Sequence, residues 1–267
     1  MNFLKCCFQS TLIASTLVSS VYAVAIESTS FEEPPVYPST YYIDLGDPAY
    51  DHQLADNPNE PVVNWTKTGS EMGFSSEYVN TRGDVGLTDG DYVGATDWTG
   101  DVTAYPTGSN GFELSDCDGL MRVSFGPVAL SGYSTAGVTL QVFVNETGWE
   151  TGTAQDSIRI WVEVDGGAQI DLLRTGTDDI DNLGIEDQWM LLSQDLSPYT
   201  TATLHVELDA NAAAEAIYID DVTFAGTPEA AAVPASSGLI ISICLLAMAG
   251  IGLAMFLRKN GDHTTIA

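Results

Sequence analysis

The sequence predicts an all-β domain, an antiparallel β-sandwich, followed by a C-terminal transmembrane helix. Three observations support this prediction. Short runs alternate apolar and polar residues with a period of two, which indicates half-buried strands. Clusters of Gly, Asp, Asn and Ser separate these runs, as turns between strands require. A stretch of 20 residues without charge follows near the C-terminus.

The first 25 residues have the pattern of a secretory signal peptide. Lys5 precedes an apolar stretch over residues 12–21, and the small residues Ala23 and Ala25 follow. A basic start, a short apolar centre and a small-x-small exit together mark a segment that is cleaved on export. Cleavage after Ala23 and cleavage after Ala25 both fit the pattern. We therefore expect the chain to be exported.

The ectodomain, residues 26–227, is predicted to contain about eight to ten short strands. In Ser157–Val164 four Ile and Val residues alternate with polar or aromatic ones, so one face of this strand is apolar. Asp165-Gly166-Gly167 is predicted as a turn that returns the chain along residues 169–174. The other strand-like runs are rich in β-branched and aromatic residues: 120–125, 138–144, 189–192, 203–208 and 217–224.

The first half of the ectodomain is less regular. Residues 31–119 are rich in loop-forming residues, and residues 50–61 are predicted as a long surface connection. No unit of about 20–50 residues repeats along the chain, which argues against a solenoid or a propeller.

The C-terminal segment has the pattern of a single membrane anchor. Residues 228–237 form a short linker, and residues 238–257 are uncharged throughout. A helix of about 20 apolar residues crosses a hydrocarbon core of about 30 Å. Arg258 and Lys259 follow at once, so the positive-inside rule places the tail, residues 258–267, in the cytoplasm. We therefore expect a single-pass protein with its N-terminal domain at the cell surface.

This tail is similar to the PEP-CTERM class of bacterial sorting signals. The similarity rests on Val233-Pro234, the apolar span and the pair Arg258-Lys259. Ala235 stands where that class has Glu, and eight residues follow Lys259. An ordinary type I anchor is an equal alternative. A sorting signal would be cut off, whereas an anchor would be retained.

The charge of the chain is concentrated on the exported part. Residues 26–233 hold five basic and 36 acidic residues, a net charge of -31. This balance excludes nucleic acid as a partner, because phosphate binding depends on Lys and Arg. The acidic residues can keep the surface solvated at high salt, or some of them can bind divalent cations.

The cysteines provide no disulfide cross-link for the ectodomain. Cys6 and Cys7 lie in the signal peptide and Cys244 lies in the apolar span, so only Cys117 remains outside. One cysteine cannot form an intrachain disulfide. The ectodomain must therefore be held together by a hydrophobic core, by calcium, or by both.

Residues 217–224 read IYIDDVTF, and Ser30-Phe31-Glu32-Glu33 lies near the start of the ectodomain. Both segments resemble jelly-roll carbohydrate-binding modules and MAM-like adhesion domains, and the resemblance covers most of the ectodomain. It implies a jelly roll whose first and last strands lie side by side and hold a calcium ion. It also implies Glu32 and Asp220 as calcium ligands, with Asp221 next. Adjacent strand residues face opposite sides unless a bulge intervenes, so one of the two Asp residues alternatively faces solvent.

Carbohydrate binding needs exposed aromatic rings that stack on the faces of sugars. Trp98 and Trp149 lie in loop-like contexts, and Trp161 lies on the face of its strand opposite the Ile and Val residues. We take these three as the candidate ligand-binding residues. The alternative for each ring is packing inside the domain.

Motifs for catalysis are weak. His52 and His205 are the only ectodomain histidines, and no Gly-x-Ser-x-Gly elbow occurs. We therefore expect a non-enzymatic surface domain that binds extracellular carbohydrate or another surface polymer, with structural calcium. Two alternatives remain: a structural or adhesive surface protein without a small ligand, and a jelly-roll enzyme that acts on polysaccharides.

Overall fold

The computed structural model describes residues 23–36, 42, 52–54, 56, 59–81, 87, 91–150, 156–176 and 178–230. The predicted span and tail, and the signal peptide before residue 23, lie outside these ranges. No helix in the described part of the chain is long and apolar enough to cross a membrane. All of the described strands belong to a compact unit that ends at Pro228.

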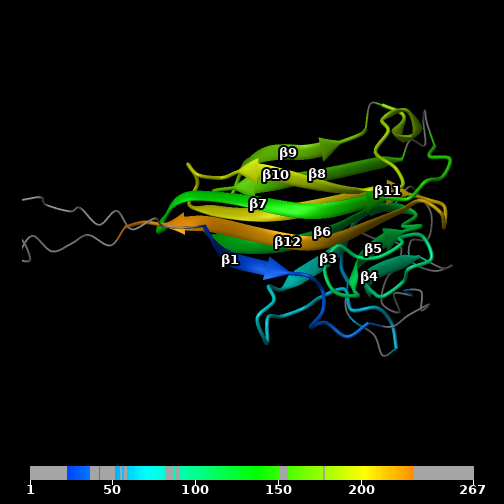
Figure 1. The fold of residues 1–267 in the computed structure, drawn as a ribbon. Coiled ribbons are helices and arrows are strands. Elements are labelled where there is room, and N and C mark those ends of the chain that lie inside the picture. Colours follow the sequence, from blue (N-terminus) through cyan, green and yellow to red (C-terminus); the bar gives the residue numbers. More distant parts are fainter. Residues whose placement is uncertain are drawn as a thin grey trace, which may run out of the picture. The chain divides into compact units, whose positions relative to one another are not determined.

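The strands form two antiparallel sheets that face each other as a sandwich (Figure 1). Sheet A has the order β10 (Trp189–Asp195), β7 (Tyr133–Val144), β12 (Ala216–Pro228), β5 (Gly111–Ser115) and β4 (Tyr92–Thr96), with β1 (Val24–Thr29) also paired to β12. Sheet B has the order β2 (His52–Gln53), β3 (Phe74–Thr81), β6 (Gly119–Ala129), β11 (Thr201–Ala210), β8 (Ser157–Val164) and β9 (Ala168–Arg174).

The predicted β-sandwich is confirmed, and every run predicted as a strand from residue 120 onward is a strand or part of one. The predicted turn joins β8 to β9 as a hairpin, and Gly166 has a φ of 71° there. Sequence patterns missed β3, β4 and β5, which lie in the segment 31–119 that was predicted as loop-rich. All five residues of β4 and of β5 are buried, including the polar residues Glu113 and Ser115, so these two strands are not half-exposed as the alternating pattern assumes.

The core lies between the two sheets and is richest where four phenylalanines meet. Phe31, Phe74, Phe112 and Phe125 are buried, and their rings form contacts with centroids 5.2–6.1 Å apart. Aromatic pairs at such distances add to the stabilisation that comes from burying their area. The rings come from both sheets and from the segment after β1, so this cluster fixes the sheets against each other.

The first and last strands lie side by side, as the resemblance implied, because β1 pairs with β12. The Phe-Glu motif itself is not part of β1, which ends at Thr29. Phe31 follows in a left-handed conformation with a φ of 60°. Its ring therefore enters the core, while the side chain of Glu32 remains exposed.

Carboxylates tie the segments around β1 to distant loops. Glu71 is buried, and its oxygens accept backbone N–H groups of Ser30, Glu32 and Glu33 at 3.0–3.2 Å. Glu33 reciprocates, because its carboxylate accepts the backbone N–H groups of Ser70 and Glu71 at 2.7 and 3.3 Å. We call this pair of carboxylates with their amides the reciprocal clasp. Hydrogen bonds with an ionised acceptor are stronger than neutral ones.

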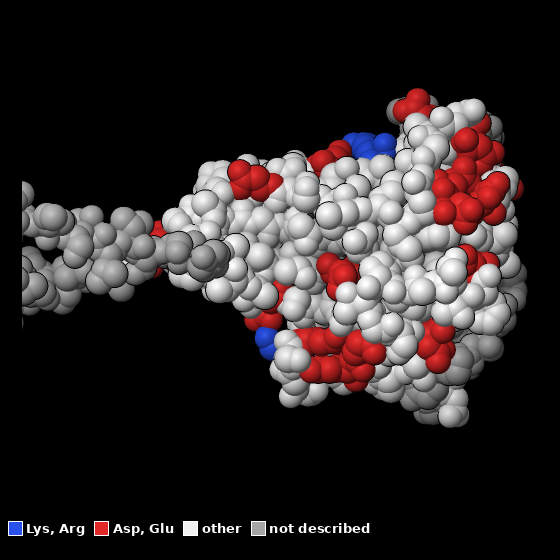
Figure 2. Space-filling model, in the orientation of Figure 1, with Lys and Arg blue, Asp and Glu red and all other residues white. Residues whose placement is uncertain are grey.

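Other acidic residues form similar contacts elsewhere. Asp165 accepts the N–H groups of Thr200 and Thr201 at 2.9 and 3.1 Å. Acidic residues dominate the charged surface on the side of β7 and β12 (Figure 2), but the clasped ones have a structural use. Cys117 is free and buried, so among the described residues these carboxylates perform the loop closure that disulfides perform in many small domains.

We predict that Glu71→Ala lowers the free energy of unfolding by about 2–4 kcal/mol, because three amides and two hydroxyls lose their shared acceptor. Urea denaturation followed by fluorescence measures this change. Glu146→Ala is the matched control, since Glu146 is exposed and should change stability by less than about 0.5 kcal/mol. Equal effects of the two substitutions would contradict the role of the reciprocal clasp.

Candidate functional site

The outer face of sheet B carries two rows of polar side chains that run across its strands. Register places Glu77, Arg122, Glu207, Arg159 and Arg174 opposite one another on β3, β6, β11, β8 and β9. Alternate residues of a strand share a face, and the intervening Ile and Val residues are in the core. The sequence thus builds this row from residues that alternate with core positions.

A second row lies beside the first. It consists of Ser75, Ser124, His205, Trp161 and Asp171 on the same five strands. We call the two rows together the polar face.

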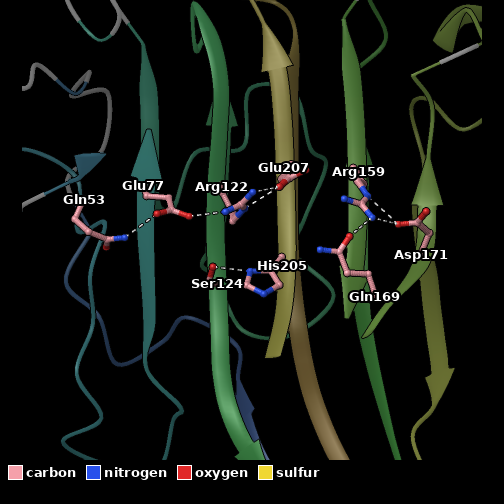
Figure 3. A network of polar contacts seen from close by, with 9 residues as sticks. All are labelled: Gln53, Glu77, Arg122, Ser124, Arg159, Gln169, Asp171, His205 and Glu207. Atoms are coloured by element: carbon pink, nitrogen blue, oxygen red, sulfur yellow. Dashed lines mark hydrogen bonds and ion pairs between the residues drawn. The ribbon is translucent and has the colours of Figure 1, made fainter. Parts of the chain in front are cut away.

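The arginines of the polar face are held by carboxylates on neighbouring strands (Figure 3). Arg122 contacts Glu77 through Nη1 at 2.6 Å, and it contacts Glu207 through Nε at 2.7 Å and Nη2 at 2.6 Å. Arg159 donates from Nε to Asp171 at 2.8 Å and from Nη2 to Gln169 at 2.9 Å. These bonds fix planar groups in place before any ligand arrives, which lowers the entropy cost of binding.

The charge of the polar face is balanced. It holds three of the five basic residues of the segment 26–233, and each of them pairs with a carboxylate. Arg174, the most exposed of the three, lies 3.5 Å from Asp171. In a domain of net charge -31, this is a region where a neutral polar ligand meets matched donors and acceptors.

His205 and Trp161 form the centre of the second row. Their rings stack with centroids 4.1 Å apart, and Ser124 Oγ lies 2.8 Å from His205 Nδ1. Burial, and then the positive charges of Arg122 and Arg159, lower the pKa of His205 to about 4. The imidazole is therefore neutral at neutral pH and can both donate and accept a hydrogen bond.

Trp161 does not match the expectation of an exposed ring. It points to the outer face as predicted, but only 4% of it is exposed, because His205 stacks on it and Arg159 lies 4.8 Å from its centroid. Its Nε1–H is buried and has no acceptor among the described residues. A buried donor without a partner costs free energy, so this N–H is a notable feature of the polar face.

The other two predicted rings differ from each other. Trp149 is 4% exposed, and its Nε1 donates to Asn145 O at 3.2 Å and to Glu186 at 3.1 Å, so it packs as a core residue. Trp98 is 43% exposed. Its ring packs over Gly100, where any side chain would collide with it. Of the three candidate rings, Trp98 alone presents a surface on which a sugar can stack.

The three predicted calcium ligands converge on one loop, residues 107–110. Glu32 accepts the N–H groups of Ser109 and Asn110 at 2.8 Å. Asp220 accepts the N–H of Thr107 at 2.8 Å, and Asp221 accepts the hydroxyl of the same residue at 2.7 Å. A bulge near Asp221, whose φ is 52°, brings both Asp residues to this loop. Their present partners are hydrogen-bond donors, as in the reciprocal clasp.

A different acidic group has the spacing of a metal site. Glu150, Asp156 and Glu215 each offer a carboxylate oxygen, and these oxygens lie within 4.8 Å of one another. Asp156 and Glu215 are both 1% exposed. Burial, with the charge of Asp156, raises the pKa of Glu215 to about 7. Among the described residues this cluster could hold a metal ion, because calcium prefers several carboxylate oxygens.

Sequence reasoning missed Arg122, Glu207 and the Glu150 cluster as site residues. Period-two alternation identifies outward-facing positions on each strand. It does not say which strands are neighbours, and β8 pairs with β11, which follows it by more than 35 residues. The partners of each arginine therefore depend on the order of strands in sheet B, which local patterns do not encode.

Comparisons with known proteins identify no family. No family model and no curated protein matches the chain. Solved structures with some similarity include a Fischerella cyclase bound to an indole compound (16% identity, 78% of this chain and 99% of that chain, TM-score 0.36). Another is the structure of xylanase 10B modules from Clostridium thermocellum with xylohexaose (16% identity, 53% of this chain and 26% of that chain, TM-score 0.30). A third is a xylan-binding domain (13% identity, 53% of this chain and 85% of that chain, TM-score 0.28). Likenesses this distant carry no argument about function.

We predict that the domain is most stable near pH 4–5 and loses stability as the pH rises. Burial raises the pKa values of Glu113, Glu215 and Asp220 to about 7. Folding therefore favours their protonated forms. That contribution is complete below the unfolded pKa of about 4 and is lost as the pH rises to about 7.

Glu33 and Asp165 have the opposite sign. Hydrogen bonds from Ser70 and from Thr200 lower their pKa values, so their contribution disappears only as the pH falls below about 4. Calorimetry in chelator should show a fall in Tm of about 5–10 °C between pH 5 and pH 8. A Tm that rises over this interval would contradict the raised pKa values.

Proposed function

We propose that this domain binds a neutral extracellular carbohydrate through the polar face. The observation that carries the proposal is the charge-balanced row of planar side chains on the polar face, around the buried Nε1–H of Trp161, which has no acceptor in the part of the chain that the structure describes. Sugar hydroxyls both donate and accept hydrogen bonds, and neighbouring hydroxyls match the spacing of the two atoms of a guanidinium or carboxylate edge.

The arginines of the polar face have N–H donors left over for hydrogen bonds to a ligand. A guanidinium has five N–H donors, and the contacts of Arg122 with Glu77 and Glu207 use its three nitrogens once each. Arg122 and Arg159 are both 24% exposed at their side chains, so a ligand lying on the face can reach them. Balanced charge favours neutral sugars over uronic acids or sulfated sugars, because an anionic ligand would approach a strongly acidic domain.

The neutral His205 supports binding rather than catalysis. A histidine acts best as a general base when its pKa lies near the working pH. With a pKa of about 4, His205 is a weak base toward the neighbouring Ser124 hydroxyl. We therefore propose a binding domain without enzymatic activity.

We also propose that the sandwich is a jelly roll. The consecutive strands β10, β11 and β12 alternate between the two sheets, which supports this assignment.

We predict saturable binding of the purified protein to neutral glycans on an array that also carries uronic-acid and sulfated glycans. Arg122→Lys keeps the charge but loses the fork geometry, and it should weaken binding at least about tenfold. Circular dichroism and Tm would confirm that this variant is folded.

Trp98→Ala is the matched control, since Trp98 lies away from the polar face and should leave binding unchanged. Binding that is lost in Trp98→Ala and kept in Arg122→Lys would move the site to the ring chosen from the sequence. An absence of glycan binding by the wild-type protein would overturn the proposal in favour of a structural or adhesive role.

We further propose that the domain binds calcium, and the Glu150 cluster is the better-supported position. Its oxygens already lie within 4.8 Å of one another. Glu215 accepts the backbone amides of Asn211 and Ala212, just as Glu32 and Asp220 accept backbone amides at the other position. Burial and the nearby charge of Asp156 raise the pKa of Glu215, and a cation there would offset both. A ligand that binds only the folded state stabilises it by mass action.

Calcium at a concentration 100 times its Kd should therefore raise the Tm at pH 7.5 by several degrees, the equivalent of about 2.7 kcal/mol. EDTA should reverse the shift, and Glu215→Gln should abolish it. Glu32→Gln serves as the matched variant for the position implied by the resemblance. A shift that is lost only in Glu32→Gln would relocate the site, and no shift in the wild-type protein would refute calcium binding.

We also propose that the domain is exported and anchored at the cell surface. The start of β1 at Val24, where it pairs with Gly226 of the last strand, supports cleavage after Ala23 over cleavage after Ala25. Cleavage after Ala25 would remove two paired residues of the first strand. N-terminal sequencing of the mature protein tests this choice.

A further inference from the structure

A groove lies at the end of the polar face, between β1 of sheet A and the beginning of β3 and end of β6 in sheet B. Its volume is about 740 Å³, within the range of pockets that bind small ligands. Apolar and aromatic residues line part of it, including Ile26, Trp65, Val128 and Tyr133. Such surfaces suit the C–H faces of sugar rings.

Local backbone contacts hold Trp65 in this groove. Trp65 and Phe74 exchange backbone hydrogen bonds at 2.8 and 3.0 Å. Gly73 makes this approach possible, because a Cβ there would collide with the carbonyl oxygen of Trp65. The backbone pairing with β3 therefore fixes the position of Trp65.

The indole of Trp65 has a donor with no acceptor. Its Nε1–H is buried and has no partner among the described residues. Buried polar groups are nearly always paired in folded proteins. The same situation occurs at Trp161 on the polar face, whereas Trp65, which is paired with Phe74, packs against the core.

The groove is continuous with the polar face. Ser75 and Ser124 line the groove, and they are also members of the second row, where Ser124 contacts His205. From Arg122 to Ala129, β6 runs roughly 20 Å at about 3.3 Å per residue. This path is longer than one sugar ring.

The charge of the groove is also balanced. Its lining contains Lys67 and Glu27, and these two form an ion pair with each other. The groove thus matches the polar face in offering hydroxyls, aromatic rings and paired charges, and it carries no excess of either sign.

We infer that the groove is a second subsite for the same ligand, so that the domain recognises several consecutive units of a linear neutral polysaccharide. This inference rests on the proposed function of the polar face. One end of the bound segment lies over His205 and Arg122, and the other end packs on Trp65, whose Nε1–H donates to a sugar oxygen. Affinity therefore increases with chain length until both subsites are filled.

Calorimetric titration with cello-, xylo- and manno-oligosaccharides of two and six units tests the inference. For the preferred series, the wild-type protein should bind the hexamer at least about tenfold more tightly than the dimer. Trp65→Ala should remove most of this difference while leaving dimer affinity within about twofold. Trp65→Phe keeps a ring but no N–H and should give an intermediate result, and it guards against misfolding of the Ala variant.

Arg122→Lys is the companion variant, and it should weaken binding of both lengths. Equal hexamer affinity in the wild-type protein and in both Trp65 variants, with binding lost in Arg122→Lys, would overturn the second subsite and leave the polar face intact. Failure of the wild-type protein to bind glycans of any series, on the array as well as in titration, would overturn both proposals.

Discussion

The interaction on which this domain depends is a carboxylate that accepts hydrogen bonds from several backbone amides of a distant segment. Glu71 and Glu33 form such contacts in both directions between the segment after β1 and the segment before β3. Without a disulfide in this region, the clasp holds the chain that enters sheet B. Glu71 of the clasp shortly precedes Gly73 and Phe74, and Phe74 pairs with Trp65. The clasp therefore helps to position the chain that lines the groove.

The two uses of charge in this protein are distinct. Carboxylates such as Glu32 and Asp165 face backbone amides and close loops, whereas those of the polar face meet arginines across strands. The first use stabilises the fold, but it also buries some carboxyl groups. Burial disfavours their ionised form and raises the pKa of Asp220. The second use creates a neutral region in an acidic domain, and the proposed ligand specificity follows from that contrast.

The sequence was sufficient for the sandwich because most strands have one buried and one outer face, as in Ser157–Val164. It was insufficient for β3 and for β4 and β5, the last two of which bury their polar residues along with the apolar ones. For the candidate site, alternation correctly placed Trp161 on the outer face but could not show that His205 and Arg159 cover it. Burial of an outward-facing ring depends on neighbours from other strands, which local sequence does not specify.

Amide hydrogen exchange at neutral pH tests the clasped carboxylates most directly, because it reports whether each loop amide has an acceptor. The account predicts that the amides of Glu32, Glu33, Ser109 and Asn110 exchange far more slowly than those of unclasped turn residues such as Gly166. Glu71→Ala should release protection at Glu32 and Glu33 while leaving Ser109 protected. Exchange at Glu32, Glu33 and Ser109 as fast as at Gly166 in the wild-type protein would contradict the account.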